Sequence, residues 1–497
     1  MKTLLTFILM TAIMAVAESP PCRWWLPGMF SENMVLQRDV PMPIWGWGPD
    51  GESVTVQIAD QKVSTTVTNG RWQVTLKPLP AGGPHTLLIL PKDETQIQMF
   101  TQVMVGDVWL VCGQSNMLMP LDETTGAADV IATAQQHPGI RVFQTGHRNP
   151  HTLTNVLTAP VAFWGAPKWE AAAYLAPRSS KTDIPGGPAA ISYYFARALD
   201  RHFEGKIPLG MIEVGAIMRG ECWIADAEIA GTPELAGLRG KPYPNATSRC
   251  FAANIAPLAP FPVRGFIYYQ GEMNAGDDHY QHTLPALIRS WRRAWGNDQL
   301  PFLIVQLPGF HKHDPAAGAH ALDMPAEFLA KLQQDTAAHG FIVVREAQRL
   351  TRATVPHTGL AVTIDLGEPF NIHPPRKREV GERLALLARQ LTYGETNLLA
   401  EAPLPKPAKF SGDKVVVQFV NATGGLVVRD DKPVGFEIAG ANGVFHLAEV
   451  TVSGDTVTAR SSGVPQPQAI RYAWAGYPQV SLFNQAGLPA TPFEMRK

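Results

Sequence analysis

The stretch that decides the fold is Asp107–Met117, which reads Asp-Val-Trp-Leu-Val-Cys-Gly-Gln-Ser-Asn-Met. Its run of apolar residues, Val108–Cys112, predicts a strand that is buried on both faces, as in a parallel sheet. Gly113 follows and can turn sharply because it has no Cβ. Ser115 is therefore expected at the carboxyl end of a buried strand, where open α/β sheets place their ligands.

A serine in that position has two interpretations. It is a nucleophile if a base lies nearby and backbone N–H groups point at the developing oxyanion. Otherwise the Gly-Gln-Ser-Asn sequence is an ordinary turn, whose hydroxyl and amide cap a helix or bond the local backbone. The rest of the chain has to decide between the two.

Length and charge narrow the possible classes of protein. At 497 residues the chain is too long for one ordinary core, so about two to four domains are expected. The formal net charge of −1 argues against binding to nucleic acid or to an anionic membrane, because neither would be attracted at long range. Beyond the N-terminus no apolar run is long enough to span a bilayer, and no clustered Cys/His spacing suggests a structural zinc.

The N-terminus has the pattern of a secretory signal peptide, residues 1–17. Lys2 supplies positive charge, Leu4–Ala15 is largely apolar, and Ala15-Val16-Ala17 is a small-x-small cleavage site. The alternative is a short membrane anchor, but the run is short and Glu18–Pro21 follows it. The mature protein is therefore expected in the periplasm or outside the cell, without stable membrane association.

Export would bring the four cysteines into an oxidising compartment. Cys112 lies in the apolar strand and is expected to be a buried thiol. Cys222 and Cys250 bracket a loop-rich segment and are the pair expected to form a disulfide; the pairing of Cys22 stays open.

Three domains follow the predicted signal peptide. Residues 18–103 are strand-like with turn signals between the strands, among them the hairpin signal Asn69-Gly70, and predict an antiparallel β-sandwich. Residues 104–399 alternate strands with helices, the mark of a parallel sheet. Residues 400–497 return to short strands after the proline-rich linker Glu401–Lys406. The fold class is therefore α/β, with a parallel-sheet catalytic domain flanked by N- and C-terminal all-β domains.

The element ranges follow from periodicity and turn signals. The expected N-terminal strands are Val40–Trp47, Ser53–Ile58, Lys62–Thr68 and Arg71–Leu76. In the central domain the strands are Ile140–Phe143, Ile207–Val214, Val263–Tyr269, Phe302–Gln306 and Leu360–Asp365, and the helices are Ala127–Gln136, Ala189–Phe203, Tyr280–Trp295, Ala326–Ala338 and Lys377–Leu391. The expected C-terminal strands are Lys414–Phe419, Gly435–Ala439, Ala448–Ser453, Thr456–Ala459 and Ala469–Ala473.

Three polar sites follow predicted strands of the central domain: Ser115, the segment Gln270–Asn274, and His373. Because the carboxyl ends of parallel strands share one edge, these sites are expected to converge there, as a hydrolase site requires. His373 is the best candidate for the base that a serine needs. It follows the strand Leu360–Asp365 by a short loop, whereas the other histidines considered sit in looser, polar surroundings.

The chain resembles the sialate O-acetylesterase family, a branch of the SGNH hydrolases. The similarity runs almost from end to end, in five blocks that keep their order. They are Met29–Arg38, Val105–Met117, Ile255–Leu258 with Tyr268–Ala275, Thr363–Pro374, and the tail segments Gly435–Gly440 with Arg471–Trp474.

The resemblance implies a mechanism that agrees with the chemistry of these residues. The family's nucleophilic serine corresponds to Ser115, and His373 would take its proton; an acetyl-enzyme forms and water hydrolyses it. The Ser115 N–H and the Gln270 side-chain amide are the expected oxyanion donors, with a further N–H from the loop after Val214, for which Gly215 is a weak candidate. Gln114, Asn116 and Glu272 are expected to line the same oxyanion and substrate-binding site. No metal or organic cofactor is implied.

The first departure from the family concerns the residue that orients His373. The family commonly has an acidic residue two or three positions before the histidine, where this chain has Asn371 and Phe370. The orienting group is then Asn371 itself, a main-chain carbonyl, or the carboxylate of Glu368 or Asp365. If no other carboxylate reaches the ring, Asn371→Asp is expected to raise kcat/KM.

Two more differences from the family lie close to the expected substrate pocket around Ser115. The loop Gly215–Gly220 replaces the family's Gly-Gly-Thr turn, so that Arg219 is able to reach into the pocket. Leu118 stands where an acidic residue is common.

Three functions remain open at this level. The leading one is a secreted enzyme that removes O-acetyl groups from sialic acids, whose carboxylate Arg219 would bind. The second is an esterase for acetylated xylan or another plant glycan. The third is a glycan-binding protein with a decayed esterase core. The first two predict an O-acetylated carbohydrate as the substrate, and the oligomeric state is not predicted.

Overall fold

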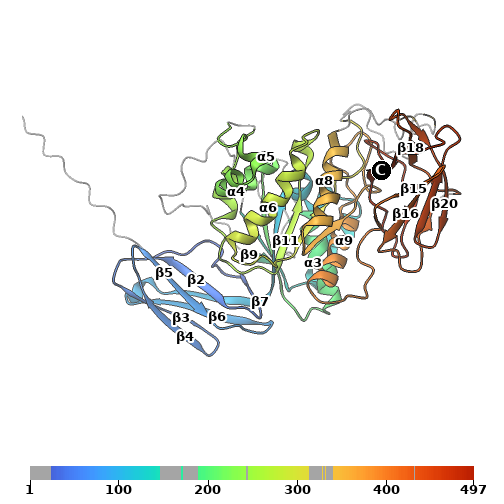
Figure 1. The fold of residues 1–497 in the computed structure, drawn as a ribbon. Coiled ribbons are helices and arrows are strands. Elements are labelled where there is room, and N and C mark those ends of the chain that lie inside the picture. The colour runs from blue at the N-terminus through green and yellow to red at the C-terminus, as the bar shows by residue number, and fades with distance from the viewer. Residues whose placement is uncertain are drawn as a thin grey trace, which may run out of the picture.

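A computed structural model describes residues 24–145, 169–171, 188–241, 245–312, 327, 331, 340–429 and 431–497. The predicted signal peptide, Cys22 and most of the predicted helix Ala326–Ala338 lie outside these ranges. Figure 1 shows a β domain at the N-terminal end in blue, a central α/β domain, and a second β domain at the C-terminal end in red. The predicted fold class is confirmed.

Strand β7 (Gln98–Gly113) lies at the centre of the catalytic sheet. The strands are ordered β13-β12-β11-β7-β10-β8-β9, and all neighbours from β13 to β8 run parallel, while β9 is an antiparallel edge. The carboxyl ends of the parallel strands therefore meet at one edge. The other bounds are β8 (Ile140–Gln144), β9 (Trp169–Ala171), β10 (Leu209–Gly215), β11 (Gly265–Tyr269), β12 (Phe302–Val305) and β13 (Thr358–Ala361).

Helices cover both faces of this sheet. Trp109 is in register with Gly265, so that Trp109 and the next residue of β11, Phe266, point to opposite faces. Trp109 packs against Phe195 of α3 (Ala190–His202), and Phe266 packs against Trp291 of α6 (Tyr280–Ala294), with ring centroids 5.1 and 5.5 Å apart. Helix α9 (Lys377–Leu391) packs beside α3, and α8 (Gly340–Thr354) beside α6.

Short helices complete the central domain. They are α1 (Ser115–Leu118), α2 (Ala127–Ala132), α4 (Asp226–Gly231), α5 (Pro233–Ala236), the 3-10 helices η2 (Leu121–Glu123), η3 (Ala134–Gln136), η6 (Gly220–Trp223) and η8 (Glu272–Asn274), and the π-helix η7 (Phe251–Ile255).

The N-terminal β domain shares strand β7 with the catalytic domain. The first half of β7 pairs with β1 and β6, and its second half pairs with β10 and β11, so that the predicted boundary between residues 103 and 104 falls within one strand. A strand can continue here because no turn sequence interrupts it. The domain consists of β1 (Val35–Gln37), β2 (Met42–Trp47), β3 (Ser53–Ile58), β4 (Gln61–Thr66), β5 (Arg71–Leu76), β6 (Gly82–Pro91) and the 3-10 helix η1 (Glu94–Gln96).

Asp107 fixes the point where β7 passes from one domain to the other. Its buried carboxylate accepts hydrogen bonds from Arg38, from Arg264 at 2.8 Å, and from the Tyr393 hydroxyl at 3.0 Å. These donors come from the N-terminal domain, from the segment before β11 and from the turn that follows α9. One buried carboxylate therefore ties the two domains together.

The C-terminal β domain has its own hydrophobic core, which includes Val417, Phe436 and Tyr472. Its loop Ala475–Gly476 is nevertheless part of the catalytic domain's packing, because the buried guanidinium of Arg345 on α8 donates to both carbonyls. The strands are β14 (Leu404–Pro405), β15 (Lys409–Ser411), β16 (Lys414–Val420), β17 (Val427–Val428), β18 (Phe436–Ala439), β19 (Phe445–Leu447), β20 (Glu449–Ser453), β21 (Thr456–Arg460), β22 (Ala469–Tyr472), β23 (Leu482–Phe483) and β24 (Phe493–Arg496).

In the central domain one predicted strand has the wrong bounds and one helix was missed. The last strand is β13 (Thr358–Ala361), not Leu360–Asp365, because the chain already turns where the Leu366 N–H donates to the Thr363 carbonyl. Helix α8 was not predicted at all.

The three cysteines among the described residues are thiols in this structure. Cys112, Cys222 and Cys250 are buried and free, as expected for Cys112, and the Sγ atoms of Cys222 and Cys250 lie 2.8 Å apart. The predicted pair is therefore in contact without a bond. Mass mapping of the non-reduced protein would test the bond.

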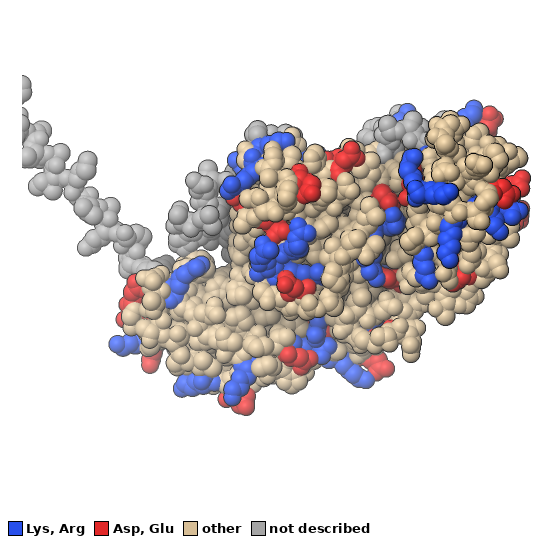
Figure 2. Space-filling view, in the orientation of Figure 1, with Lys and Arg blue, Asp and Glu red and all other residues tan. Residues whose placement is uncertain are grey.

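The sequence contains nearly equal numbers of basic and acidic residues, and both kinds occur on the surface (Figure 2). On the face seen in Figure 2, Lys and Arg side chains are interspersed with Asp and Glu. No helix among the described residues is long and apolar enough to cross a bilayer.

Candidate active site

Ser115 lies at the carboxyl end of the central strand, at the first position of α1. The turn that exposes it needs Gly113, because a Cβ there would meet the Tyr269 carbonyl oxygen at 2.1 Å. Ser115 is half-buried, and its N–H belongs to the first turn of a helix, where N–H groups have no intrahelical acceptor. The local geometry therefore presents both the hydroxyl and a backbone donor at the sheet edge.

His373 meets Ser115 at this edge. Its Nε2 lies 2.8 Å from Ser115 Oγ, within hydrogen-bond distance, although 258 positions separate the two residues in the chain. His373 is exposed and belongs to the loop between β13 and α9. The structure thus brings together the nucleophile and base that the sequence predicts, in the contact that general-base activation of a serine requires.

Two of the residues proposed to orient His373, Asn371 and Glu368, are hydrogen-bonded within its loop. Asn371 Oδ1 accepts from the backbone N–H of His373 at 2.9 Å, and Asn371 Nδ2 donates to Glu368 Oε2 at 3.0 Å. Both carboxylate oxygens of Asp365 accept from Arg383 at 2.7 Å. The geometry therefore assigns Asp365 to a structural ion pair with α9, while Asn371 links Glu368 to the backbone of His373.

Gln270 is buried at the end of β11 and its amide is already engaged. Nε2 donates to Asn274 Oδ1 at 2.9 Å and to the Met218 carbonyl at 3.3 Å, and Oε1 accepts from the Tyr280 hydroxyl at 3.1 Å. An amide NH₂ has two hydrogens, and both are used. Gln270 therefore shapes the wall behind the site, and the prediction that it donates to the oxyanion does not fit this geometry.

The loop after β10 is close to Ser115 but mostly tied down. A Cβ on Gly215 would meet Leu118 Cδ1 at 2.2 Å, so that Leu118 of α1 packs directly on Gly215. The N–H of Ala216 donates to the Gly113 carbonyl, and the N–H of Gly220 donates to Asn274 Oδ1 at 2.8 Å. Of the predicted oxyanion donors, the Ser115 N–H is the one that this geometry supports.

Arg219 does not extend freely into the pocket. It is paired with Asp277 and with Glu221, and it donates to the Met273 carbonyl at 3.2 Å. Burial raises the pKa of Asp277, but the backbone N–H of His279 and the charge of Arg219 outweigh it and hold that pKa below its usual value. Two carboxylates therefore already engage the guanidinium that was proposed to bind a sialic acid carboxylate.

Asn116 and Glu272 lie directly behind the Ser115–His373 pair. Asn116 Nδ2 donates to Glu272 Oε1 at 2.6 Å and to the Ile372 carbonyl at 2.9 Å, and Asn116 Oδ1 accepts from Lys377 Nζ at 2.5 Å. Gln114 is buried, and its Oε1 has no partner among the described residues. The Asn116 and Glu272 side chains are therefore held by protein partners next to the reacting residues.

Lys377 was not predicted to be part of this site. A signal was present: lysine is electrostatically unfavourable at the start of a helix, where the dipole is positive.

Among the described residues there is no group of three or more His, Cys, Asp or Glu side chains that could hold a metal ion.

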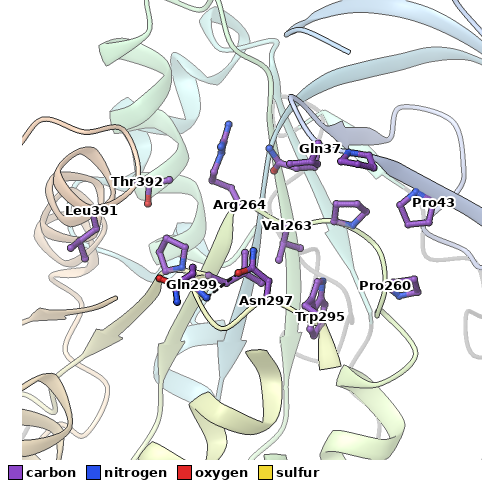
Figure 3. A pocket seen from close by; sticks show the side chains of 15 residues that line it. Gln37, Pro43, Pro260, Val263, Arg264, Trp295, Asn297, Gln299, Leu391 and Thr392 are labelled. Carbon is purple, nitrogen blue, oxygen red and sulfur yellow. Dashed lines mark hydrogen bonds between the residues drawn. The ribbon is translucent and has the colours of Figure 1, made fainter. Parts of the chain in front are cut away.

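A pocket of about 510 Å³ lies at the opposite end of the sheet (Figure 3). It is formed where the N-terminal domain meets the catalytic domain, with Gln37, Pro43, Arg264, Trp295 and Asn297 around it. Arg264 precedes β11, whereas the candidate active site follows that strand. The pocket is therefore a separate feature of the domain boundary.

Comparison with known proteins agrees with this site. The family model described as carbohydrate esterase, sialic acid-specific acetylesterase matches residues 105–385, which include Ser115, Glu272, His373 and Lys377. The sialate O-acetylesterase of Homo sapiens is 27% identical over 517 residues, covering 93% of this chain and 91% of that protein. The sialate O-acetylesterase of Mus musculus is 26% identical and covers 98% and 97%.

A solved structure shares the whole architecture. The crystal structure of a carbohydrate acetylesterase from Xanthomonas citri superposes with a TM-score of 0.79 at 34% identity, covering 95% of this chain and all of that one. The matched family region, the curated relatives and this structural neighbour thus agree. The chain belongs to the sialic acid-specific acetylesterase family of carbohydrate esterases.

Proposed function

We propose that this carbohydrate esterase cleaves O-acetyl groups from carbohydrates through an acetyl-enzyme on Ser115. The observation that carries the proposal is the 2.8 Å contact between Ser115 Oγ and His373 Nε2 at the carboxyl edge of a parallel sheet. The family membership supplies the acetyl ester as the substrate group.

The contact supports a two-step reaction. His373 Nε2 takes the proton of Ser115 Oγ as that oxygen attacks the acetyl carbonyl; the sugar oxygen then leaves with the proton from the imidazolium, and acetyl remains on Ser115. In the second step His373 takes a proton from water, whose oxygen attacks the acetyl carbonyl, and Ser115 leaves with the proton as acetate is released. The Ser115 N–H stabilises the oxyanion in both steps.

The leading substrate class is O-acetylated sialic acid. Support comes from the description of the matched family and from the names of the curated relatives. One observation favours a second candidate, a neutral acetylated glycan such as acetylxylan. Arg219 is engaged with Asp277 and Glu221, so it does not offer a free guanidinium to a sugar carboxylate.

We further infer that the enzyme acts after export, in the periplasm or outside the cell. Support comes from the charged, apolar and small-residue pattern of residues 1–17. N-terminal sequencing of the mature protein is expected to start at Glu18, and an intact Met1–Ala17 segment on the isolated protein would contradict export by this route.

The function is tested by side-by-side turnover of O-acetylated sialic acid, acetylxylan and 4-nitrophenyl acetate. Wild type is expected to release acetate, and Ser115→Ala to lose essentially all of it with an unchanged fold. Ser64→Ala is the matched control, because Ser64 is an exposed hydroxyl on β4 of the N-terminal domain. Absence of turnover by wild type on all three esters would favour a glycan-binding protein with a decayed core.

A further inference from the structure

A buried polar network lies between the two halves of the active site. Its centre is the Asn116 side chain, which contacts Glu272 on η8, the Ile372 carbonyl and Lys377 on α9. Asn116 is adjacent in the chain to Ser115, and Ile372 is adjacent to His373. The network therefore joins the backbone on either side of the 2.8 Å Ser115–His373 contact.

The partners leave the Asn116 amide only one orientation. The Ile372 carbonyl can only accept a hydrogen bond, and the ammonium form of Lys377 can only donate one. The oxygen of Asn116 must therefore face Lys377, and its NH₂ must face Ile372 and Glu272. The lysine and the glutamate thus hold opposite ends of the amide, and reversing it would break every one of these bonds.

Stability alone does not account for the two charged groups. Lys377 is 1% exposed and stands at the positive end of the α9 dipole. Burial lowers its pKa from 10.5 to about 7, against the opposing charges of Glu272 and Glu368. Burial also raises the pKa of Glu272, and its Oε2 is buried without a partner among the described residues. Apolar side chains commonly fill such a space at no loss of stability.

We propose that Glu272 and Lys377, acting through the Asn116 side chain, are positioning residues that hold Ser115 and His373 at hydrogen-bond distance. The inference rests on the proposed serine mechanism. Neither residue contacts the reacting atoms; each fixes one end of an amide that links α1 to the histidine loop. Because a general base must lie within about 0.5 Å of its working position, a loose link lowers kcat far more than it changes KM.

The two charges also act on His373 in opposite directions. The groups that face Lys377 are Glu272 of η8, Glu368 of the histidine loop, Asn116 of α1 and the ring of Tyr269 on β11, whose centroid is 5.4 Å from Nζ. Removing the lysine would raise the pKa of the imidazole, and removing the glutamate charge would lower it. These shifts test whether the two groups carry charge beside His373, and the fall in kcat tests whether they position it.

The test uses Lys377→Met, Glu272→Gln and the control Arg389→Met. Glu272→Gln keeps an acceptor for Asn116 and changes only the charge and Oε2, so it retains the shape of the site. Arg389 lies near the other end of α9 and pairs with Glu395, so its substitution removes a cation and an ion pair from the same helix. With 4-nitrophenyl acetate, kcat is expected to fall about 10- to 100-fold in Lys377→Met and about 10-fold in Glu272→Gln, with KM within about threefold. Arg389→Met should stay within twofold of wild type on both parameters.

The second readout is the pKa of His373, measured by NMR on protein labelled at histidine. Lys377→Met should raise it and Glu272→Gln should lower it, each by a few tenths of a unit or more. Folded variants with wild-type kcat would overturn the inference whether or not the His373 pKa moves, and should Lys377→Met fail to fold, Glu272→Gln decides alone. An inactive wild type would instead refute the proposed function, while the opposite shifts of the histidine pKa would still be measurable.

Discussion

The Asn371–Glu368 contact makes Asn371→Asp a demanding test of how the histidine loop is held. In the wild type Asn371 Nδ2 donates to Glu368 Oε2 at 3.0 Å, and Oδ1 accepts from the His373 N–H at 2.9 Å. An aspartate keeps the second bond but replaces the first with two facing carboxylates. The sequence predicts a gain from this substitution only if no other carboxylate reaches the ring, whereas the contact with Glu368 predicts a loss.

The expected loss follows from that geometry. One hydrogen bond worth about 1 kcal/mol disappears, and two like charges about 4 Å apart repel by roughly 1–4 kcal/mol between water-like and surface-like dielectrics. Both groups are half-buried, and the pair relieves part of the repulsion by taking up a proton. If the displaced His373 raises the activation free energy by about 1.4–2.7 kcal/mol, kcat/KM falls about 10- to 100-fold at pH 8. The deficit relative to wild type should shrink at pH 5.5.

The decisive variant is the double substitution Glu368→Gln/Asn371→Asp. A glutamine at 368 donates to the aspartate at 371, which restores the bond with its polarity reversed, so kcat/KM should recover to within about threefold of wild type. Initial rates on 4-nitrophenyl acetate across pH 5.5–8 measure all four proteins. An Asn371→Asp variant as active as wild type, or a double variant no better than the single one, would refute this view of the loop.

Three further outcomes follow from the structure. Gln270→Ala should lower the free energy of unfolding by about 2–4 kcal/mol, because buried partners including Tyr280 and Asn274 lose a hydrogen bond. A 100-fold fall in kcat without a loss of stability would instead support Gln270 as an oxyanion donor. Arg345→Met should lower that free energy by about 3–5 kcal/mol in urea, because the carbonyls of Pro308, Ala475 and Gly476 lose their donor; an unchanged midpoint would show that the C-terminal domain does not depend on this contact. Between pH 7 and 10.5 the unfolded chain binds the Lys377 proton more tightly than the folded chain, so the stability from this group is lowest below pH 7 and rises with pH, by up to about 1.4 kcal/mol per pH unit. The free energy of unfolding of the wild type should therefore rise relative to that of Lys377→Met over that range. Parallel curves of stability against pH for the two proteins would contradict the lowered pKa of Lys377.

The order of strands and helices was largely predictable because it depends on local patterns. Val108–Cys112 is apolar without interruption and is buried on both faces in the structure, and the helix Lys377–Leu391 has the predicted bounds. The convergence of Ser115 and His373 followed from a topological rule, that parallel strands end at one edge. Helix α8 was missed because its first five residues, Gly-Phe-Ile-Val-Val, are a glycine followed by β-branched and aromatic residues, which favour strands.

Partners of polar side chains were not predictable in the same way. Asp365 and Gln270 looked catalytic because of their places in the chain, yet Arg383 and Asn274 engage them in the folded protein. Such pairings depend on side-chain directions across elements that are far apart in sequence. The continuity of β7 through two domains was hidden for a related reason, because a change of fold pattern need not coincide with a break in the strand.

The most direct test of the central claim is to find the acetyl group on the enzyme. Wild type mixed with 4-nitrophenyl acetate, quenched in acid within milliseconds and digested, should yield a peptide containing Ser115 that is heavier by one acetyl group and disappears as turnover ends. Ser115→Ala should show no such peptide, whereas Ser64→Ala should match wild type. Acetate release by wild type with no acetylated Ser115 peptide at any quench time, or full turnover by Ser115→Ala, would contradict the serine mechanism.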